Sequence, residues 1–141
     1  MGNDGAAEAT QDVLVSISSD IDVLTARSQG RAMAATLGFS SSEKTLIATA
    51  ISEVARNIVT YAKRGEILLR VVAQGSRRGI LVTARDQGPG IPDIAQAMED
   101  GYSTGGSLGL GLPGSKRLMD EFEVVSEMGR GTSVTMIKWE R

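Results

Sequence analysis

The feature that most constrains the fold is a broad apolar stripe between residues 41 and 61. Its apolar positions recur at helical spacing, which predicts one amphipathic helix that buries a wide face. These positions are Leu46, Ile47, Ala50, Ile51, Val54, Ala55 and Ile58. Capping residues at 41–44 open this helix, and residues 63–65 end it.

A second helix is predicted over residues 20–37, with Ser19 or Asp20 as its cap and Gly38 as its stop. Its apolar positions are Ile21, Leu24, Met33, Ala34 and Leu37. Short strands are predicted at 13–17, 66–73, 80–86, 122–126 and 132–139, with hairpin turns at 74–79 and 128–131. A short helix at 92–98, a loop at 99–108 and a helix at 110–120 complete the pattern.

The resulting order, β-α-α-β-β-α-loop-α-β-β, predicts an α+β fold in two layers, a sandwich with helices on one face of a sheet. A doubly wound parallel sheet would alternate strands and helices regularly. Residues 1–11 lack periodicity and are expected to form a disordered tail, whereas residues 12–141 form a single domain.

Composition excludes several classes of chemistry. The 141 residues include no cysteine and no histidine, which removes disulfides, thiolates, imidazole bases and phosphohistidine intermediates. A net charge of −2 gives no reason to expect nucleic acid or a membrane surface as a partner. No apolar run approaches the roughly 20 residues of a membrane helix, and no signal peptide is visible, so a cytoplasmic protein is expected.

Three separated groups of residues carry candidate chemistry. Glu53 and Asn57 lie one helical turn apart at the edge of the apolar stripe. The carboxylate is a candidate general base, and the amide oxygen is a candidate Mg²⁺ ligand. The alternative is an ordinary solvated helix edge.

The second group is the segment 86–90, Asp-Gln-Gly-Pro-Gly, at the end of a predicted strand. Asp86 can accept a hydrogen bond from an exocyclic amino group such as that of adenine, while Gly88 and Gly90 let the backbone approach a flat ligand. A plain strand-end turn is the alternative, because such turns use the same residue types.

The third group is the glycine-rich run from Gly105 to Gly114, whose backbone N–H groups can face phosphate oxygens. Gly109, Gly111 and Gly114 match G-x-G-x-x-G, but no strand precedes them as a dinucleotide fold requires. A P-loop fails because Ser115 stands where the lysine belongs. A flexible surface loop remains the alternative. A weaker fourth segment, 129–132, forms a turn that places the Thr132 hydroxyl at the start of the last strand.

In this order and on these elements, the groups resemble the GHKL ATPase superfamily, whose ATP pocket is the Bergerat fold. Segments such as AISEVARNI, DQGPGIPDI and GRGTSV further resemble its small bacterial serine/threonine switch kinases, of the RsbT type. The resemblance implies a mixed, mostly antiparallel sheet. It also implies that Glu53 is the general base, that Asn57 binds Mg²⁺, that Asp86, Gly88 and Gly90 bind adenine, and that Thr132 lies nearby. The hinge of a short ATP lid at roughly 91–107 would wrap the phosphates and would consist of Gly105, Gly106, Ser107, Leu108, Gly109, Leu110 and Gly111.

The resemblance also implies partners. Kinases of this type phosphorylate STAS-domain proteins of the RsbS and RsbR types, and when released they activate a PP2C-type phosphatase such as RsbU. Two alternatives stay open: an anti-sigma factor of the same fold, and a scaffold that no longer uses nucleotide. Residues 91–107 contain no lysine or arginine, so the charge of the γ-phosphate has to be met by Mg²⁺, by backbone amides, by Ser103 or Thr104, or by a basic residue elsewhere. The candidate basic residues are Arg27, Arg31, Arg56 and Lys116.

Overall fold

The computed structural model describes residues 12–91, 98 and 112–140. In chain order its elements are β1 (Val13–Ile17), α2 (Asp20–Thr36), α3 (Ser41–Asn57), the π-helical turn η1 (Ile58–Ala62), β2 (Gly65–Gln74), β3 (Arg77–Asp86), α5 (Leu112–Leu118), β4 (Glu121–Glu127) and β5 (Gly131–Trp139). The expected tail at 1–11, the loop at 99–108 and nearly all of the expected helix at 92–98 lie outside the described residues.

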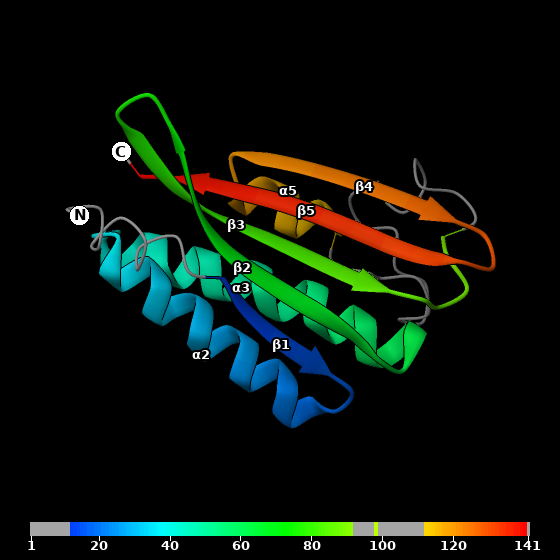
Figure 1. Ribbon diagram of the computed structural model, residues 1–141. Coiled ribbons are helices and arrows are strands. Elements are labelled where there is room, and N and C mark those ends of the chain that lie inside the picture. Colours follow the sequence, from blue (N-terminus) through cyan, green and yellow to red (C-terminus); the bar gives the residue numbers. More distant parts are fainter. Residues whose placement is uncertain (1–11, 92–97, 99–111, 141) are drawn as a thin grey trace, which may run out of the picture.

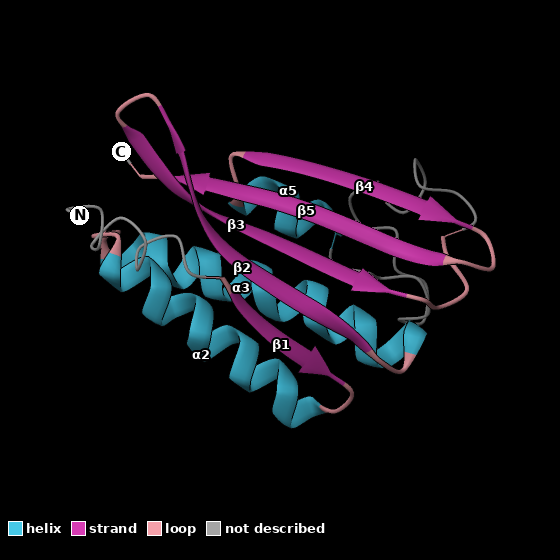
Figure 2. Cartoon of the chain, viewed as in Figure 1, coloured by secondary structure: helices cyan, strands magenta, loops and turns pink. Residues whose placement is uncertain are grey.

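Five strands form one sheet in the order β1-β2-β3-β5-β4. The helices cover one face of it, which confirms the two-layer α+β sandwich (Figures 1 and 2). The expectation of a mixed sheet was wrong, because all four pairings between the described strands are antiparallel. The reason is the connection from β1 to β2. It runs through two helices of 17 residues each, so the chain returns to the end of the sheet where β1 stopped.

The core lies between the sheet and α3. Ile47, Ile51, Val54 and Ile58 are at most 1% exposed, and they meet fully buried side chains of the three central strands. Those strand residues are Ile67, Leu69, Ile80, Val82 and Met136. Each such burial contributes about 1.5–3 kcal/mol relative to an exposed side chain.

The predicted apolar face of the 20–37 helix was partly wrong. Ile21 and Leu24 are 72% and 60% exposed, whereas the buried positions of α2 include the small residues Ala26, Gly30 and Ala34. A Cβ at position 30 would collide with the Ile51 side chain. The small residues therefore let α2 approach α3 closely, and packing against α3 rather than hydrophobicity alone selects the buried face.

Local polar contacts fix where both long helices begin. Ser40 Oγ accepts the Glu43 N–H at 3.1 Å, and Glu43 Oε1 accepts the Ser40 N–H at 3.3 Å, which is a capping box one residue before the predicted start. At α2, the Asp22 carboxylate accepts the N–H of Ser18 at 2.8 Å and of Ser19 at 3.1 Å. The hydrogen bond from Ser18 is the main cause that lowers the pKa of Asp22.

The predicted helix over 41–61 changes character before its end. The α-helix stops at Asn57, and residues 58–62 form a π turn. Lys63 then adopts φ 76°, and Gly65 starts β2 where any Cβ would collide with the Arg85 carbonyl oxygen. The π turn carries Ile58 and Tyr61, which prove to be wall residues of a cavity.

The last helix, α5, covers the middle of the predicted 110–120 helix; residues 110 and 111 lie outside the described part. Lys138, only 8% exposed, donates to the Leu118 carbonyl at 3.0 Å, and Asp120 N–H donates to the Ile137 carbonyl at 2.9 Å. These contacts end α5 and lead the chain into β4.

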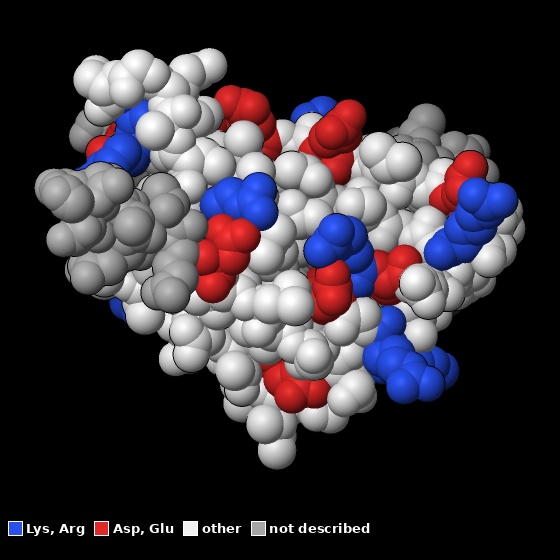
Figure 3. Space-filling view, in the orientation of Figure 1, with Lys and Arg blue, Asp and Glu red and all other residues white. Residues whose placement is uncertain are grey.

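The face of the sheet without helices carries charged residues in neighbouring opposite-sign pairs (Figure 3). Arg70 pairs with Asp12 at 2.8 Å, and Arg85 pairs with Glu66 at 2.6 Å. No helix in the described part of the chain is long and apolar enough to cross a membrane.

Candidate nucleotide site

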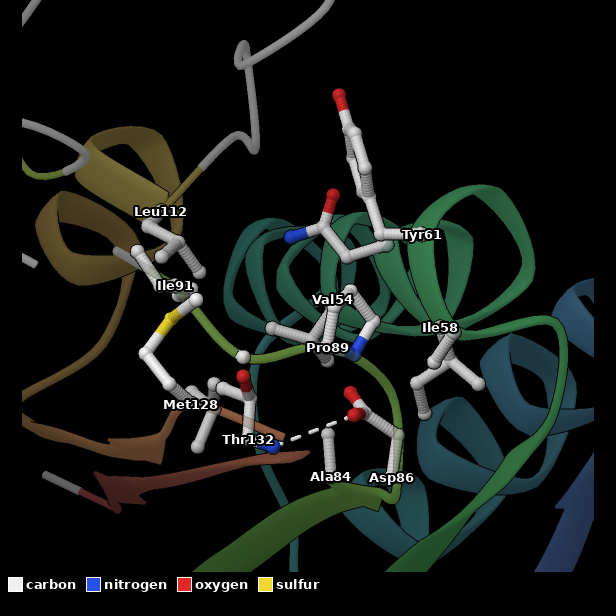
Figure 4. A pocket seen from close by; sticks show the side chains of 14 residues that line it. Val54, Ile58, Tyr61, Ala84, Asp86, Pro89, Ile91, Leu112, Met128 and Thr132 are labelled. Carbon is white, nitrogen blue, oxygen red and sulfur yellow. Dashed lines mark hydrogen bonds between the residues drawn. The ribbon is translucent and has the colours of Figure 1, made fainter. Parts of the chain in front are cut away.

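A cavity of about 280 Å³ opens between the end of α3, the π turn and the adjoining ends of β3 and β5 (Figure 4). Most of its wall is apolar. The lining residues are Val54, Asn57, Ile58, Tyr61, Ala62, Ala84, Asp86, Pro89, Gly90, Ile91, Leu112, Met128, Thr132 and Val134. A flat, largely apolar ligand with a few polar edge groups suits such a wall.

Asp86 supplies the carboxylate of this wall. It ends β3, and its Oδ1 accepts the N–H of Gly88 at 2.9 Å and of Thr132 at 3.2 Å. Among the described residues, no group donates to Oδ2, which faces the cavity in Figure 4. One oxygen is thus fixed by the backbone, and the other is left as an acceptor for a ligand.

The structure favours glycine at positions 88 and 90, after Asp86, for two different reasons. A Cβ at Gly88 would lie 2.6 Å from the Ala62 Cβ, so the backbone there packs directly on the end of the π turn. Gly90 has φ +87°, a conformation that side chains disfavour, and it lines the cavity. Both therefore shape the segment that follows Asp86, although only Gly90 is a wall residue.

Hydrogen bonds tie this segment to the β4–β5 hairpin. Gly129 N–H donates to the Pro89 carbonyl at 2.9 Å, and Ile91 N–H donates to Ser126 Oγ at 2.7 Å. Ser126 Oγ also lies 3.0 Å from Thr132 Oγ1. Sequence reasoning missed Ser126, because its role depends on a contact 35 residues away in the chain.

Thr132 lies close to Asp86 and lines the same cavity. Its backbone N–H rather than its hydroxyl contacts the carboxylate. The preceding Gly131 has φ +124°, and a Cβ there would collide with the Asp86 carbonyl oxygen. This glycine was also missed as a site residue, and its signal was the G-x-G-T turn.

Glu53 and Asn57, which were predicted as a pair, do not both line the cavity. Asn57 lines the cavity, whereas Glu53, one turn earlier, lies outside its wall. The Glu53 side chain is 39% exposed, and its Oε2 lies 3.8 Å from Arg56 Nη1. Because both partners of this ion pair are well exposed, it stabilises the helix only weakly.

Most of the glycine-rich run, from Gly105 to Gly111, lies outside the described residues. The first described residue after it, Leu112, is 1% exposed and forms part of the cavity wall at the start of α5. Leu112 is thus the residue of the longer run 105–114 that the structure places against the cavity.

None of the candidate cations lines the cavity. Arg31 donates to Thr45 Oγ1 at 3.2 Å on the surface between α2 and α3, and Arg27 and Lys116 are exposed. Among the described residues, no group of three acidic side chains could hold a metal ion. The Asn57 amide oxygen still fits Mg²⁺, because this ion is commonly held by one or two protein oxygens together with phosphates.

Comparison with known proteins agrees with this geometry. Residues 17–138 match the family described as histidine kinase-like ATPase domain. The chain is 52% identical over 127 residues to the serine/threonine-protein kinase RsbT of Bacillus subtilis, which covers 90% of this chain and 96% of that protein. It is 34% identical over 120 residues to an anti-sigma F factor of Thermoanaerobacter, with 81% and 82% of the two chains covered.

A solved structure shows the same fold. The crystal structure of the RsbU and RsbW domains of Rv1364c from Mycobacterium tuberculosis matches with a TM-score of 0.60 at 21% identity. The match covers 94% of this chain and 33% of that longer chain. The chain thus belongs to the histidine kinase-like ATPase domain family, whose ligand is ATP, and it is a homologue of the serine/threonine-protein kinase RsbT.

Proposed function

We propose that this protein is an ATP-dependent protein serine/threonine kinase. Its 52% identity to a protein named as such, over nearly the full length of both, supports the activity. The single structural observation that carries the proposal is the Asp86 carboxylate, held by two backbone N–H groups at one oxygen with the other facing the cavity.

In this proposal, Asp86 selects adenine. The free carboxylate oxygen accepts a hydrogen bond from the adenine amino group, whereas guanine would present a carbonyl oxygen there and repel it. Gly88 and Gly90 shape the floor beneath the base. Thr132 fixes the carboxylate from the opposite strand, and the apolar wall covers the faces of the ring.

Asn57 would bind Mg²⁺ through its amide oxygen, at the end of the cavity wall that α3 supplies. When bound, Mg²⁺ neutralises charge on the phosphates of ATP. The run Gly105, Gly106, Ser107, Leu108, Gly109, Leu110 and Gly111 would form the lid over those phosphates. Leu112, the residue that follows this run, lines the cavity.

Glu53 would act as the general base. One turn before Asn57 on the same helix, its carboxylate would take the proton of a serine or threonine hydroxyl. The hydroxyl oxygen bonds to the γ-phosphorus, the bond from that phosphorus to the bridging oxygen breaks, and ADP leaves. Since Glu53 lies outside the wall of the base cavity, its position is consistent with a protein substrate that approaches from outside.

The proposed substrates are STAS-domain proteins of the RsbS and RsbR types, and a PP2C-type phosphatase similar to RsbU is the proposed partner of the released kinase. These partners rest on the resemblance to the RsbT type. The second candidate function is an anti-sigma factor, which the 34% identity to anti-sigma F factors favours.

The test is phosphoryl transfer from labelled ATP and Mg²⁺ to a STAS-domain protein of the same genome. Wild-type protein is expected to transfer label, and Glu53→Gln is expected to bind ATP without transfer. Glu123→Gln, an exposed carboxylate on β4, is the matched control and should transfer normally. Equal transfer by Glu53→Gln would rule out the base assignment. Capture of a sigma factor without any transfer would favour the anti-sigma function.

A further inference from the structure

An exposed methionine forms part of the wall of the proposed ATP cavity. Met128 lies in the turn between β4 and β5 and is 63% exposed, yet it lines the cavity. Figure 4 shows its thioether extending from this turn toward Ile91. The side chain is therefore open to solvent on one side and to the ligand space on the other.

The turn that carries Met128 is well fixed. Gly129 N–H donates to the Pro89 carbonyl and Arg130 N–H donates to the Glu127 carbonyl, both at 2.9 Å. The backbone on the C-terminal side of Met128 is thus bonded to both the cavity segment and its own hairpin. Because these bonds hold the backbone in place, a chemical change at this side chain would alter the wall of the cavity.

Met128 differs from the other described methionines. Met136 is 0% and Met119 is 6% exposed, so both are shielded by the core. Met33 and Met98 are partly buried and do not line the cavity. Susceptibility of methionine to oxidation follows exposure, so Met128 is the described methionine most open to an oxidant.

The chemistry needs only a peroxide. A lone pair of the thioether sulfur attacks one peroxide oxygen, the S–O bond forms as the O–O bond breaks, and the peroxide is reduced to water. The product, methionine sulfoxide, is polar and is reversible by reductases.

A sulfoxide does not suit this position. Figure 4 shows Ile91 beside the Met128 thioether, and neither it nor the wall residues Leu112 and Val134 offer a side-chain donor. The nearby Thr132 hydroxyl already lies 3.0 Å from Ser126 Oγ. The sulfoxide oxygen must either face the base without a partner or turn to water and withdraw the side chain from the wall. Both outcomes remove apolar contact from the ligand.

We propose that Met128 is an oxidative modification site at which a peroxide weakens ATP binding reversibly. The proposal rests on the assignment of this cavity to the ATP base. Because the side chain is largely exposed, the expected loss of affinity is at the low end of the penalty for an unpaired polar group, about five- to tenfold. The effect would couple kinase activity to oxidant exposure.

The test measures the ATP dissociation constant of each protein before and after mild peroxide treatment. Each treated variant is compared with the same variant untreated. Peptide mass spectrometry follows the order of oxidation, and Met128 is expected to react before Met119 and Met136. The dissociation constant of wild-type protein should rise about five- to tenfold, and methionine sulfoxide reductase should restore it. For Met128→Leu, the ratio of the ATP dissociation constant after treatment to that before treatment should be near one, whatever the affinity of the untreated variant. Met33→Leu, which keeps Met128, should respond as the wild type does.

Two results would overturn the inference while leaving the kinase proposal intact. One is complete oxidation of Met128 with less than a twofold change in ATP affinity. The other is oxidation of Met136 before Met128. Failure of the untreated protein to bind ATP would instead overturn the cavity assignment, and with it this inference. A melting curve of the treated protein separates a local effect from unfolding.

Discussion

The substitution Asp86→Asn is expected to weaken ATP binding far more than it weakens folding. In the wild type, Oδ1 accepts two backbone N–H groups, from Gly88 and Thr132, and leaves the other oxygen to the ligand. Asparagine can keep both backbone hydrogen bonds only by placing its carboxamide oxygen at the position of Asp86 Oδ1. Its amino group then takes the outer position and faces the adenine amino group, donor against donor.

The size of the effect follows from this geometry. Loss of a hydrogen bond to a carboxylate costs about 1.5–3 kcal/mol, and an unpaired buried donor costs about 1–3 kcal/mol more. Together these costs amount to about 2.5–6 kcal/mol, which raises the ATP dissociation constant at least about 60-fold, since each 1.4 kcal/mol is tenfold. The free energy of unfolding should fall by only about 1 kcal/mol, because both backbone bonds survive with a neutral acceptor.

Isothermal titration with ATP and GTP, together with urea unfolding, measures both quantities. The asparagine amino group can donate to the guanine carbonyl, so the preference for ATP over GTP should fall. Asp20→Asn, at an exposed position in the first turn of α2, is the matched control and should leave nucleotide affinity unchanged. A dissociation constant for ATP within fivefold of wild type would refute the reasoning. So would a large loss of stability, which would make Asp86 a structural residue.

Three further substitutions or conditions test the fold. Ser115 Oγ is buried and has no hydrogen-bond partner among the residues that the structure describes, so Ser115→Ala should raise the free energy of unfolding by about 1 kcal/mol. A loss of that size would show a missed partner. Lys63 has φ 76°, a backbone conformation that glycine adopts with less strain, so Lys63→Gly should raise the free energy of unfolding by about 1 kcal/mol. A destabilised variant would indicate that contacts of the lysine side chain stabilise the protein by more than the backbone strain costs. The hydrogen bond from Ser18 lowers the pKa of Asp22, so its stabilising contribution is present above the ordinary pKa of an aspartate and is lost as pH falls through the lowered pKa. Acid unfolding of Asp22→Asn should accordingly depend less steeply on pH below the ordinary pKa of an aspartate, and an unchanged slope would contradict the assignment.

Local sequence signals were enough to place most of the described elements. Helical periodicity and polar caps located α2 and α3, and alternating β-branched runs located all five strands. These signals depend on neighbours within one helical turn or one hairpin, and the chain itself contains that information. Asp86 and Thr132 were also predicted as site residues, because each stands at a strand end with glycines beside it.

Other features of the fold were not predictable in this way. Ile21 and Leu24 match an apolar stripe, yet they are exposed, because close packing of α2 on α3 needs the small residues Ala26 and Gly30 at the contact. No pattern in the sequence predicts the π turn that follows Asn57. Its effect is to present Tyr61 to the cavity.

The sequence by itself determined which residues are chemically suited to hold ATP: a carboxylate, an amide and glycine-rich turns. Only the tertiary structure decided which of them share one cavity. The pairing of β3 with β5 brings Asp86 next to Thr132, 46 residues later in the chain, and the β4–β5 hairpin brings Met128 to the same wall. It also places Ser126 where it bonds to Ile91 and Thr132. That pairing depends on burial of the whole sheet against α3 rather than on any local preference, so no segment of the sequence specifies it alone.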